Sequence, residues 1–428
     1  MTALAPPLVH HGHVVALPEQ ADVVVIGAGI VGLATARAVQ VARPDLHVVV
    51  VDKEPRVAAH QSGHNSGVVH AGLYYRPGSR KAQLCRDGRA ELLGWCDRHD
   101  VAYRRCGKVV VATEPSELDA LAELERRATA NGVAATRIGP AELADLEPYA
   151  FGLAALHVPE TAVVDFGRVT AGLADDVVAR GGTVALGRAV LGIERRGRET
   201  VVRTSGGDVR TSRVANCGGL HSDRIAALAG DRPAAAIVAF RGEYHELAPR
   251  AVHMVRALVY PVPDPRFPFL GVHLTRGIDG SVHAGPNAVL ASSREGYRRR
   301  DVRLEDVAEL ARYRGTWRLA GRYWRDGAAE VARSLSHARL ARAVQRLIPE
   351  LDPADLVPAG SGVRAQAVAP DGRLVDDFAF AGDDRVVHVV NAPSPAATAS
   401  LAIGRVVASR LLGGSEDASA SDAPGRVE

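Results

Sequence analysis

Hydrophobic residues near the N-terminus form two short apolar runs separated by a longer segment of small and apolar residues. The first run spans Val23 to Ile26, and the second fills most of Leu46 to Asp52. Between them, the residues from Ile30 to Val41 have the composition of a closely packed helix. Two buried parallel strands joined by a crossover helix make a βαβ unit, so this pattern predicts an α/β lobe at this end of the chain.

The rest of the chain alternates between helical and extended patterns. We expect helices within residues 76–105, 116–132 and 301–348, and a strand at 108–113. Mostly strand and loop are predicted for 237–290, since the stretch 259–275 holds too many prolines for a helix. Two segments, 183–197 and 201–219, look like a small antiparallel insertion that leads back to a buried strand. The chain then closes with a strand, a turn and a helix beginning near Pro395.

These elements predict an α/β protein of two lobes. A Rossmann-like, glutathione-reductase-type FAD-binding domain would be discontinuous and interleaved with a mostly antiparallel β-sheet substrate domain. The expected division is a leader (1–20), a cofactor domain (21–95, 155–235 and 355–412), a substrate domain (96–154 and 236–354) and a disordered tail (413–428).

Composition narrows the class of protein. The 428 residues carry a formal net charge of only +3, so no global charge favours nucleic acid as a partner. The cations are nearly all Arg, with Lys only at Lys53, Lys81 and Lys108, which lowers the weight of any single Arg. The four cysteines form no Cys-x-x-Cys pair, so no metal site is expected, and such usage fits a reducing compartment. With no signal peptide and no membrane-spanning run, we expect a cytoplasmic protein, in which peripheral membrane contact stays open.

A dinucleotide fingerprint follows the first apolar run. Gly27, Gly29 and Gly32 match G-x-G-x-x-G, in which the glycines permit a tight turn, close approach of a phosphate and close helix packing. The intervening Ile30 and Val31 open the helix, whose N-terminus would face the pyrophosphate. Asp52 ends the next strand about 20 residues later, where it would accept from ribose hydroxyls, and Lys53 beside it is counted as cofactor-binding.

The position of the fingerprint favours FAD over NAD. The chain has a single fingerprint, at its extreme N-terminus, and a second strand-turn-helix at its other end. The N-terminus of that last helix would point toward a bound ring system. An anionic reduced flavin would be stabilised there.

The segment "HQSGHNSGVVHAGLYYRPGSRKAQLCRDG" resembles the L-2-hydroxyglutarate oxidases/dehydrogenases, FAD enzymes of the D-amino-acid-oxidase-like superfamily. The similarity extends from about Asp22 to Ile403 and includes "FRGEYHEL", "GSGVRAQAVAPDGRLVDDFAF" and "VNAPSPAATASLAIG". It implies oxidation of L-2-hydroxyglutarate to 2-oxoglutarate, with hydride passing from C2 to N5 of a non-covalently bound FAD. O₂ or a quinone-type acceptor would then reoxidise the flavin.

The resemblance also implies which residues surround the cofactor. They would contact adenine, pyrophosphate or flavin from five segments: Ser62, Asn65, Ser66 and Gly67; Val190; Cys217, Gly218 and Gly219; Gly362 and Val363; and Pro393, Ser394 and Pro395. Two positions depart from the family pattern. Asp52 stands where many members carry Glu, and His245 stands where Tyr is expected, a position that would touch substrate.

Oxidation of a 2-hydroxy acid requires a fixed carboxylate and an acceptor for the hydroxyl proton. Arg364 is the first candidate for the carboxylate because a guanidinium binds both oxygens, and Arg241 is a weaker second. Tyr260 and His273 are candidates for a second carboxylate. His64 and His70 are alternative proton acceptors, between which the sequence does not choose, and His60 lies nearer the ribose end.

Three other interpretations compete with this one. A related flavoenzyme would act on an amino acid, sarcosine or glycerol 3-phosphate. A flavin- or nucleotide-binding protein without turnover would keep the glycines and lose the pocket residues, and an NAD-dependent dehydrogenase would lack flavin. Finally, the Arg-rich stretches 298–300 and 312–325 fit either a solvated helical face or a contact with an anionic membrane.

Overall fold

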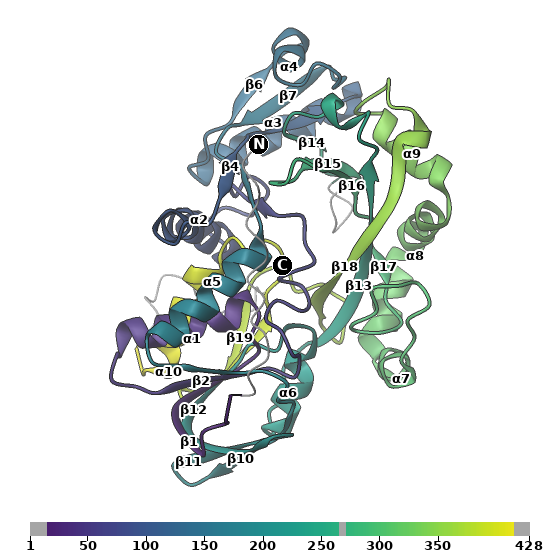
Figure 1. Ribbon diagram of the computed structural model, residues 1–428. Helices are drawn as coiled ribbons and strands as arrows, with labels where there is room; N and C mark the ends of the chain where they lie inside the picture. Colours follow the sequence, from purple (N-terminus) through teal and green to yellow (C-terminus); the bar gives the residue numbers. More distant parts are fainter. Residues whose placement is uncertain (1–14, 265–270, 415–428) are drawn as a thin grey trace.

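The computed structural model describes residues 15–264 and 271–414, which form two lobes joined through the middle of the molecule (Figure 1). One lobe contains an eight-stranded sheet with parallel strands at its centre, and the other contains a nine-stranded, mostly antiparallel sheet. The segments 1–14, 265–270 and 415–428 lie outside the described residues, so most of the predicted leader and tail is not assessed.

The eight-stranded sheet is built around the apolar run at the N-terminus. Strand β1 (Gln20–Ile26) pairs in parallel with β2 (Val48–Val51) and β12 (Gly207–Asn216), and all four valines of β2 are buried. A strand buried on both faces needs a continuous apolar sequence, which explains these runs. The other strands are β9 (Thr183–Ala185), β10 (Val190–Arg196), β11 (Glu199–Thr204), β19 (Ala379–Gly382) and β20 (Val386–Asn391).

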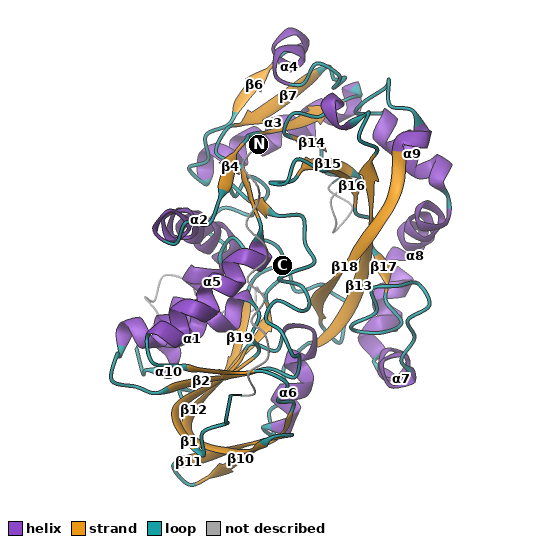
Figure 2. Cartoon of the chain, viewed as in Figure 1, coloured by secondary structure: helices purple, strands orange, loops and turns teal. Residues whose placement is uncertain are grey.

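Helices cover this sheet, as the purple ribbons in Figure 2 show. They are α1 (Ile30–Ala42), α2 (Arg80–Arg98), α5 (Phe166–Ala179), α6 (Ser222–Leu228) and α10 (Ser400–Leu411). Helices α1 and α10 touch backbone to backbone, because a Cβ on Gly404 would lie only 2.6 Å from the Ala34 carbonyl oxygen. This packing ties the last helix of the chain to the helix that follows the glycine fingerprint.

The nine-stranded sheet curves over the first lobe. Its strands are β5 (Lys108–Ala112), β6 (Thr136–Ile138), β7 (Ala154–Val158), β13 (Ala236–Leu247), β14 (Leu258–Pro261), β15 (His273–Arg276), β16 (Val282–Gly285), β17 (Val289–Leu290) and β18 (Leu356–Val368). Strand β18 pairs only with β13, so its other edge faces the first lobe (Figure 1).

The remaining elements surround this sheet or bridge the lobes. Their bounds are α3 (Leu118–Ala130), α4 (Pro140–Leu146), α7 (Leu304–Arg312), α8 (Arg314–Leu335) and α9 (His337–Gln345), a small sheet of β3 (Val68–Val69), β8 (Ala162–Val164) and β4 (Tyr103–Arg105), and the 3₁₀ turns η1 (Pro115–Glu117), η2 (Gly219–His221), η3 (Val252–Met254) and η4 (Pro353–Asp355). In the part of the chain that the structure describes, no helix is long and apolar enough to cross a bilayer.

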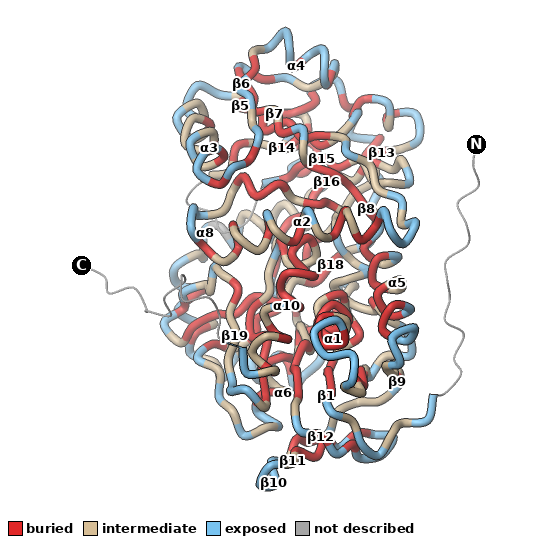
Figure 3. Tube along the Cα trace, turned by 90° about the vertical axis from the view of Figure 1, so that its left-hand side faces the viewer, coloured by how far each residue is buried: buried red, intermediate tan, exposed pale blue. Residues whose placement is uncertain are grey.

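Buried segments run through both lobes and across the join between them (Figure 3). Trp95 of α2 is fully buried, and a Cβ on Gly172 of α5 would lie 2.8 Å from its ring. Large side chains therefore fill the space beneath small residues on neighbouring helices, which holds α2 and α5 in place.

Three expectations need correction. The helix predicted over 76–105 covers only Arg80–Arg98 and is followed by strand β4, and α10 begins at Ser400 rather than near Pro395. Strands β7 and β18 fall in segments assigned to the cofactor domain, yet they hydrogen-bond into the nine-stranded sheet. We therefore propose domain boundaries that follow β7 and β18, since strand pairing is a property of tertiary contacts.

Candidate active site

A cavity of about 600 Å³ lies over the C-terminal ends of β1 and β2. Eleven of the residues predicted to bind the cofactor line it: Gly27, Gly29, Ile30, Val31, Asp52, Lys53, Ser62, Val190, Cys217, Gly218 and Gly219. It extends past Ala365 to Ala396 and Ala397, so it joins the glycine fingerprint to the turn before α10. The predicted residues that do not line it are Gly32, Asn65, Ser66, Gly67, Gly362, Val363, Pro393, Ser394 and Pro395.

The three fingerprint glycines have different structural roles. Gly27 has φ +111°, a conformation that favours glycine, and a Cβ there would lie 2.6 Å from the Cys217 carbonyl oxygen. A Cβ on Gly32 would lie 1.9 Å from the Gly27 carbonyl oxygen, so the turn and α1 are in direct backbone contact. By contrast, a Cβ on Gly29 would meet only Ser62 Oγ, at 3.2 Å, and would otherwise enter the cavity. The missing side chain at Gly29 thus leaves space in the cavity for a ligand, whereas Gly27 and Gly32 allow close contacts within the protein.

The N-terminus of α1 faces this space and has no acidic residue in its first turn. Backbone N–H groups at such a terminus bind anions, which suits a pyrophosphate. The Ile30 amide donates to Ser62 Oγ at 2.9 Å. Asp52 accepts from the Ala28 amide at 2.6 Å and from the Glu54 amide at 2.8 Å, and burial raises the pKa of its carboxyl group. Asp52 therefore supports the glycine turn as well as facing the cavity.

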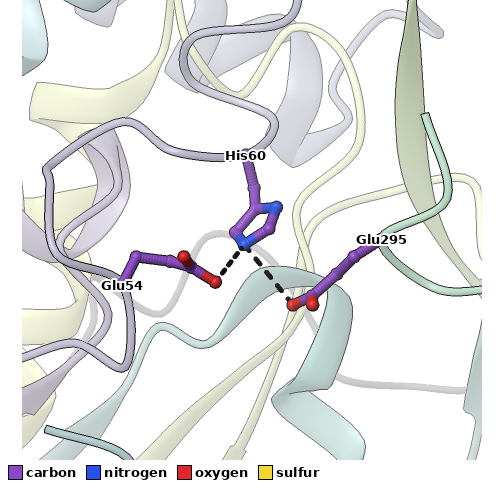
Figure 4. Close-up of side chains that lie close together, drawn as sticks. All are labelled: Glu54, His60 and Glu295. Carbon is purple, nitrogen blue, oxygen red and sulfur yellow. Dashed lines mark hydrogen bonds and ion pairs between the residues drawn. The ribbon is translucent and has the colours of Figure 1, made fainter. Parts of the chain in front are cut away.

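A network of ion pairs closes one side of the cavity. Glu54 and His60 follow β2, whereas Glu295 belongs to the loop after β17, and Figure 4 shows the imidazole of His60 between the two carboxylates. His60 Nε2 is 2.9 Å from Glu54 Oε1 and 3.4 Å from Glu295 Oε1. Lys53 Nζ lies 2.6 Å from Glu295 and also contacts Glu54, and His221 Nε2 lies 2.7 Å from Glu295.

Although this geometry could hold a metal ion, the cluster already contains its own cations. Burial opposes ionisation of Glu295, but bonds from His221 and Lys53 prevail and lower its pKa well below the usual range. The ammonium group of Lys53 touches both carboxylates and supplies the positive charge that a metal would otherwise bring. The network therefore joins the two lobes beside the cofactor cavity, and both of its carboxylates have lysine and histidine partners.

The loop His60–Tyr75 continues from this cavity to the free edge of β18. His64 Nδ1 bonds to the His60 carbonyl oxygen at 3.0 Å, and its ring lies 4.3 Å from that of Tyr297. A Cβ on Gly362 would come within 2.8 Å of the His64 carbonyl oxygen, so Gly362 allows the loop to reach the strand. Gly362 thus has a packing role in addition to the predicted one.

His70 lies deeper, beside the turn before α10. Its Nε2 is 3.4 Å from Ser394 Oγ, and its amide donates to Thr398 Oγ1 at 3.1 Å. Burial, reinforced by the positive charges of Lys108, His273 and Arg364, lowers the pKa of His70 to about 3. The imidazole is therefore neutral near pH 7, and its Nδ1 has no hydrogen-bond partner among the described residues.

Tyr260 and His273 sit side by side on adjacent strands of the sheet. Their rings stack at 4.0 Å between centroids, and His273 Nδ1 bonds to the Gly271 carbonyl oxygen at 2.8 Å. Burial lowers the pKa of His273 to about 4 and raises that of Tyr260. The structure therefore brings four predicted residues together: His70, Tyr260, His273 and Arg364.

Arg241 does not join this group. Antiparallel pairing matches Phe240 with Arg364 and Arg241 with Val363, so the two arginines leave opposite faces of the sheet. The guanidinium of Arg241 donates to the Arg298 carbonyl oxygen at 3.0 Å and forms an ion pair with Glu243. The expectation that it faces the same site as Arg364 is not supported, because only the strand register determines which face a residue occupies.

His245 is also turned away from this group. Its ring lies 5.9 Å from that of His337 on α9. Instead, the ring of the preceding Tyr244 approaches the position that a Gly362 side chain would take, at 3.7 Å. A bulge between Glu243 and His245 shifts the register here, so the tyrosine near the site is one residue earlier than expected.

Sequence reasoning missed Lys108 and Tyr74. Lys108 begins β5 and is only 2% exposed, and its Nζ lies 4.4 Å from the centre of the Tyr74 ring. The signal was present in the composition, because Lys108 is one of only three lysines in an Arg-rich chain.

Comparison with known proteins identifies relatives across nearly the whole chain. The family model described as FAD dependent oxidoreductase matches residues 22–410. An L-2-hydroxyglutarate dehydrogenase of Indibacter alkaliphilus is 44% identical, covering 90% of this chain and 97% of its own. The enzyme of the same name from Escherichia coli K12 is also 44% identical (91% and 93% covered), and the human mitochondrial one is 42% identical (91% and 88% covered).

Solved structures share the fold at lower identity. L-alpha-glycerophosphate oxidase of Mycoplasma pneumoniae, determined with FAD bound, has a TM-score of 0.75 at 20% identity, covering 92% of this chain and 95% of its own. Glycine oxidase of Geobacillus kaustophilus has a TM-score of 0.71 at 17% identity, with 94% and 96% covered. These neighbours confirm the predicted α/β fold class, and the cradle around Gly29 fits the predicted dinucleotide.

Proposed function

The chain belongs to the FAD-dependent oxidoreductase family and groups there with L-2-hydroxyglutarate dehydrogenases, and we propose that it oxidises L-2-hydroxyglutarate to 2-oxoglutarate. The observation that carries the proposal is the 42–44% identity to enzymes of that name over about nine-tenths of the chain. The buried Lys108 and the half-buried Arg364, both of which act on His70, agree with a substrate that carries carboxylates.

The cofactor is FAD, which supplies the acceptor for the hydride from C2 when it is bound. Gly27, Gly29 and the N-terminus of α1 would hold its pyrophosphate, with Asp52 toward the ribose. Ser394 and Gly362 lie at the other end of this region, next to the groups that would face substrate.

The residues around His70 would then bind and deprotonate the substrate. Arg364 fits the carboxylate next to the reacting carbon, since its fork binds both oxygens. His70 is the preferred proton acceptor because its Nδ1 has no partner among the described residues and its ring lies beside the turn before α10. His64 remains the alternative, although its Nδ1 is already bonded to the His60 carbonyl oxygen.

An anaerobic titration with L-2-hydroxyglutarate tests this function. We expect the L-enantiomer to bleach the flavin absorbance of the purified holoprotein and the D-enantiomer to leave it unchanged. If neither enantiomer bleaches it, the substrate assignment is wrong, and bleaching by an amino acid or glycerol 3-phosphate would identify the related flavoenzymes instead.

We also propose that the acceptor is a quinone reached by peripheral contact with an anionic membrane, rather than O₂. Trp317 and Trp324 are 65% and 61% exposed, and they lie on either side of a kink at Tyr323 in the Arg-rich helix α8. Aromatic residues beside cations suit a bilayer interface.

Vesicle binding tests this contact. We expect the protein to sediment with vesicles containing phosphatidylglycerol but not with pure phosphatidylcholine vesicles, and Trp317→Ala with Trp324→Ala to reduce binding. Rapid reoxidation of the reduced enzyme by O₂, without vesicle binding, would instead favour an oxidase.

A further inference from the structure

The group around His70 contains a buried lysine that has no counter-ion among the described residues. Lys108 Nζ lies 4.4 Å from the centre of the Tyr74 ring and 5.2 Å from that of Tyr260. No carboxylate among residues 15–264 and 271–414 forms an ion pair with it. Contacts with aromatic faces offset only part of the cost of burying an ammonium group, so this site is electrostatically incomplete.

Register places Lys108 on the face that carries the predicted substrate residues. Tyr260 pairs with Val110, which is two residues from Lys108 and therefore points the same way. Tyr260 in turn stacks on His273 of the next strand. Three adjacent strands thus contribute Lys108, Tyr260 and His273 to one surface facing the loop that holds His70.

Other polar atoms here also have no partner. Tyr74 Oη and His70 Nδ1 are buried without a hydrogen bond to any described residue. Buried polar groups are nearly always satisfied in native proteins, so an unpartnered tyrosine hydroxyl and an unpartnered imidazole nitrogen next to an unneutralised ammonium group indicate a polar, anionic ligand.

Two cations flank the histidines from opposite ends of the sheet. Arg364 lies on β18, and Lys108 lies on β5, with β13, β16, β15 and β14 in between. Both positive charges nevertheless act on His70 and on His273, so both cations lie near these histidines. Arg364 shares its face with Gly362, near the cofactor edge of the sheet, which leaves Lys108 at the distal end.

We propose that Lys108 binds the C5 carboxylate of the substrate while Arg364 binds the C1 carboxylate, so that Lys108 selects dicarboxylic over monocarboxylic 2-hydroxy acids. This inference rests on the proposed function and adds to it the residue that sets specificity. A monocarboxylate would leave the ammonium group buried and unpaired, and sites that leave a buried charge unpaired discriminate strongly.

Substitution of Lys108 tests the proposal through a ratio of activities. The substrates are L-2-hydroxyglutarate and L-2-hydroxypentanoate, which has the same carbon chain without the second carboxylate. We expect Lys108→Met to lower kcat/KM for the diacid by about 30-fold or more and to change that for the monoacid by less than about threefold. Lys108→Arg keeps the charge and should retain most of the preference.

Lys81→Met is the matched control, because it removes an ammonium group whose partner, Asp376, is 90% exposed. We expect it to keep the wild-type ratio, since the Lys81 ammonium group already has a carboxylate partner. An unchanged diacid preference in Lys108→Met would overturn the proposal. If the wild-type protein oxidised neither acid, the proposed function itself would fail.

A measurement on the wild-type protein avoids any question of folding. Binding of the unreactive diacid glutarate, followed by the flavin spectrum, is compared with binding of pentanoate from about pH 6 to about pH 9. Burial lowers the pKa of Lys108 to about 7, whereas the neighbouring groups whose pKa values shift do not titrate in this range: His70, His273, Tyr74, Tyr260 and Cys85.

Glutarate should therefore bind up to about tenfold more weakly for each pH unit above the pKa of Lys108, while pentanoate binding stays constant. Equal pH dependence for the two ligands would overturn the assignment of Lys108 to the second carboxylate.

Discussion

The two charged clusters of this protein differ in how their charges are balanced. Beside the cofactor cavity, Glu54 and Glu295 are paired with Lys53, His60 and His221, so that network is complete without any ligand. Next to His70, by contrast, Lys108 contacts aromatic rings and forms no ion pair among the described residues, and the nearby charges that act on the histidines are positive. A balanced network supports the walls of a site, whereas an unbalanced one leaves a place for an anion that must arrive from outside.

The largest effect is expected in the cluster next to His70. His70→Asn removes the proposed proton acceptor, so kcat should fall by about 10²–10⁴-fold while FAD content stays at the wild-type level. Steady-state kinetics with L-2-hydroxyglutarate and the flavin spectrum measure the two quantities. If His64→Asn caused this loss and His70→Asn did not, the base would be His64.

Two glycine variants distinguish a glycine that the fold requires from a glycine that FAD binding requires. Gly32→Ala places a methyl group 1.9 Å from the Gly27 carbonyl oxygen, so we expect it to lower the free energy of unfolding by about 3 kcal/mol or more. Gly29→Ala meets only Ser62 Oγ and should leave the apoprotein within about 1 kcal/mol of wild type.

The same Gly29→Ala variant should weaken FAD binding by about tenfold or more, because the methyl group enters the cavity. Denaturant unfolding of the apoproteins and titration with FAD give both numbers. Equal loss of apoprotein stability in the two variants would show that Gly29 serves the fold rather than the ligand.

An effect on stability alone is expected for the balanced network. Glu295→Gln leaves Lys53 and His221 with one fewer carboxylate, which should cost about 1–3 kcal/mol of stability near pH 7. The folded-state pKa of Glu295 is lowered, so its contribution is present above its unfolded pKa of about 4.3 and is lost as pH falls toward the folded value. The difference between variant and wild type should therefore shrink on acidification, as thermal unfolding at several pH values can show.

Local sequence was sufficient to predict the structure wherever residues that are neighbours in the chain determine it. The apolar runs at Val23–Ile26 and Val48–Val51 are strands, and the fingerprint glycines have the close backbone contacts that the motif implies. The start of α10 was misjudged, because Pro395 permits a helix start but the chain makes further turns before Ser400.

Residues brought together by long-range strand pairing were harder to assign. Arg241 and Arg364 look equivalent along the chain, yet pairing of β13 with β18 sends them to opposite faces. Because of a bulge, Tyr244 rather than His245 lies near Gly362. Lys108 carried no motif at all, and only the curvature of the sheet places it within reach of His70.

The sequence by itself determined the cofactor class, the α/β architecture and the chemical types needed for a 2-hydroxy acid, since these depend on short motifs and on residue identity. The tertiary structure alone decided which of those residues share a site and which of them lack a counter-ion. The physical reason is that the face of the sheet on which a side chain lies depends on strand register, and that its charge balance depends on burial. Both depend on contacts between residues such as Lys108 and Arg364, which are more than 250 positions apart in the chain.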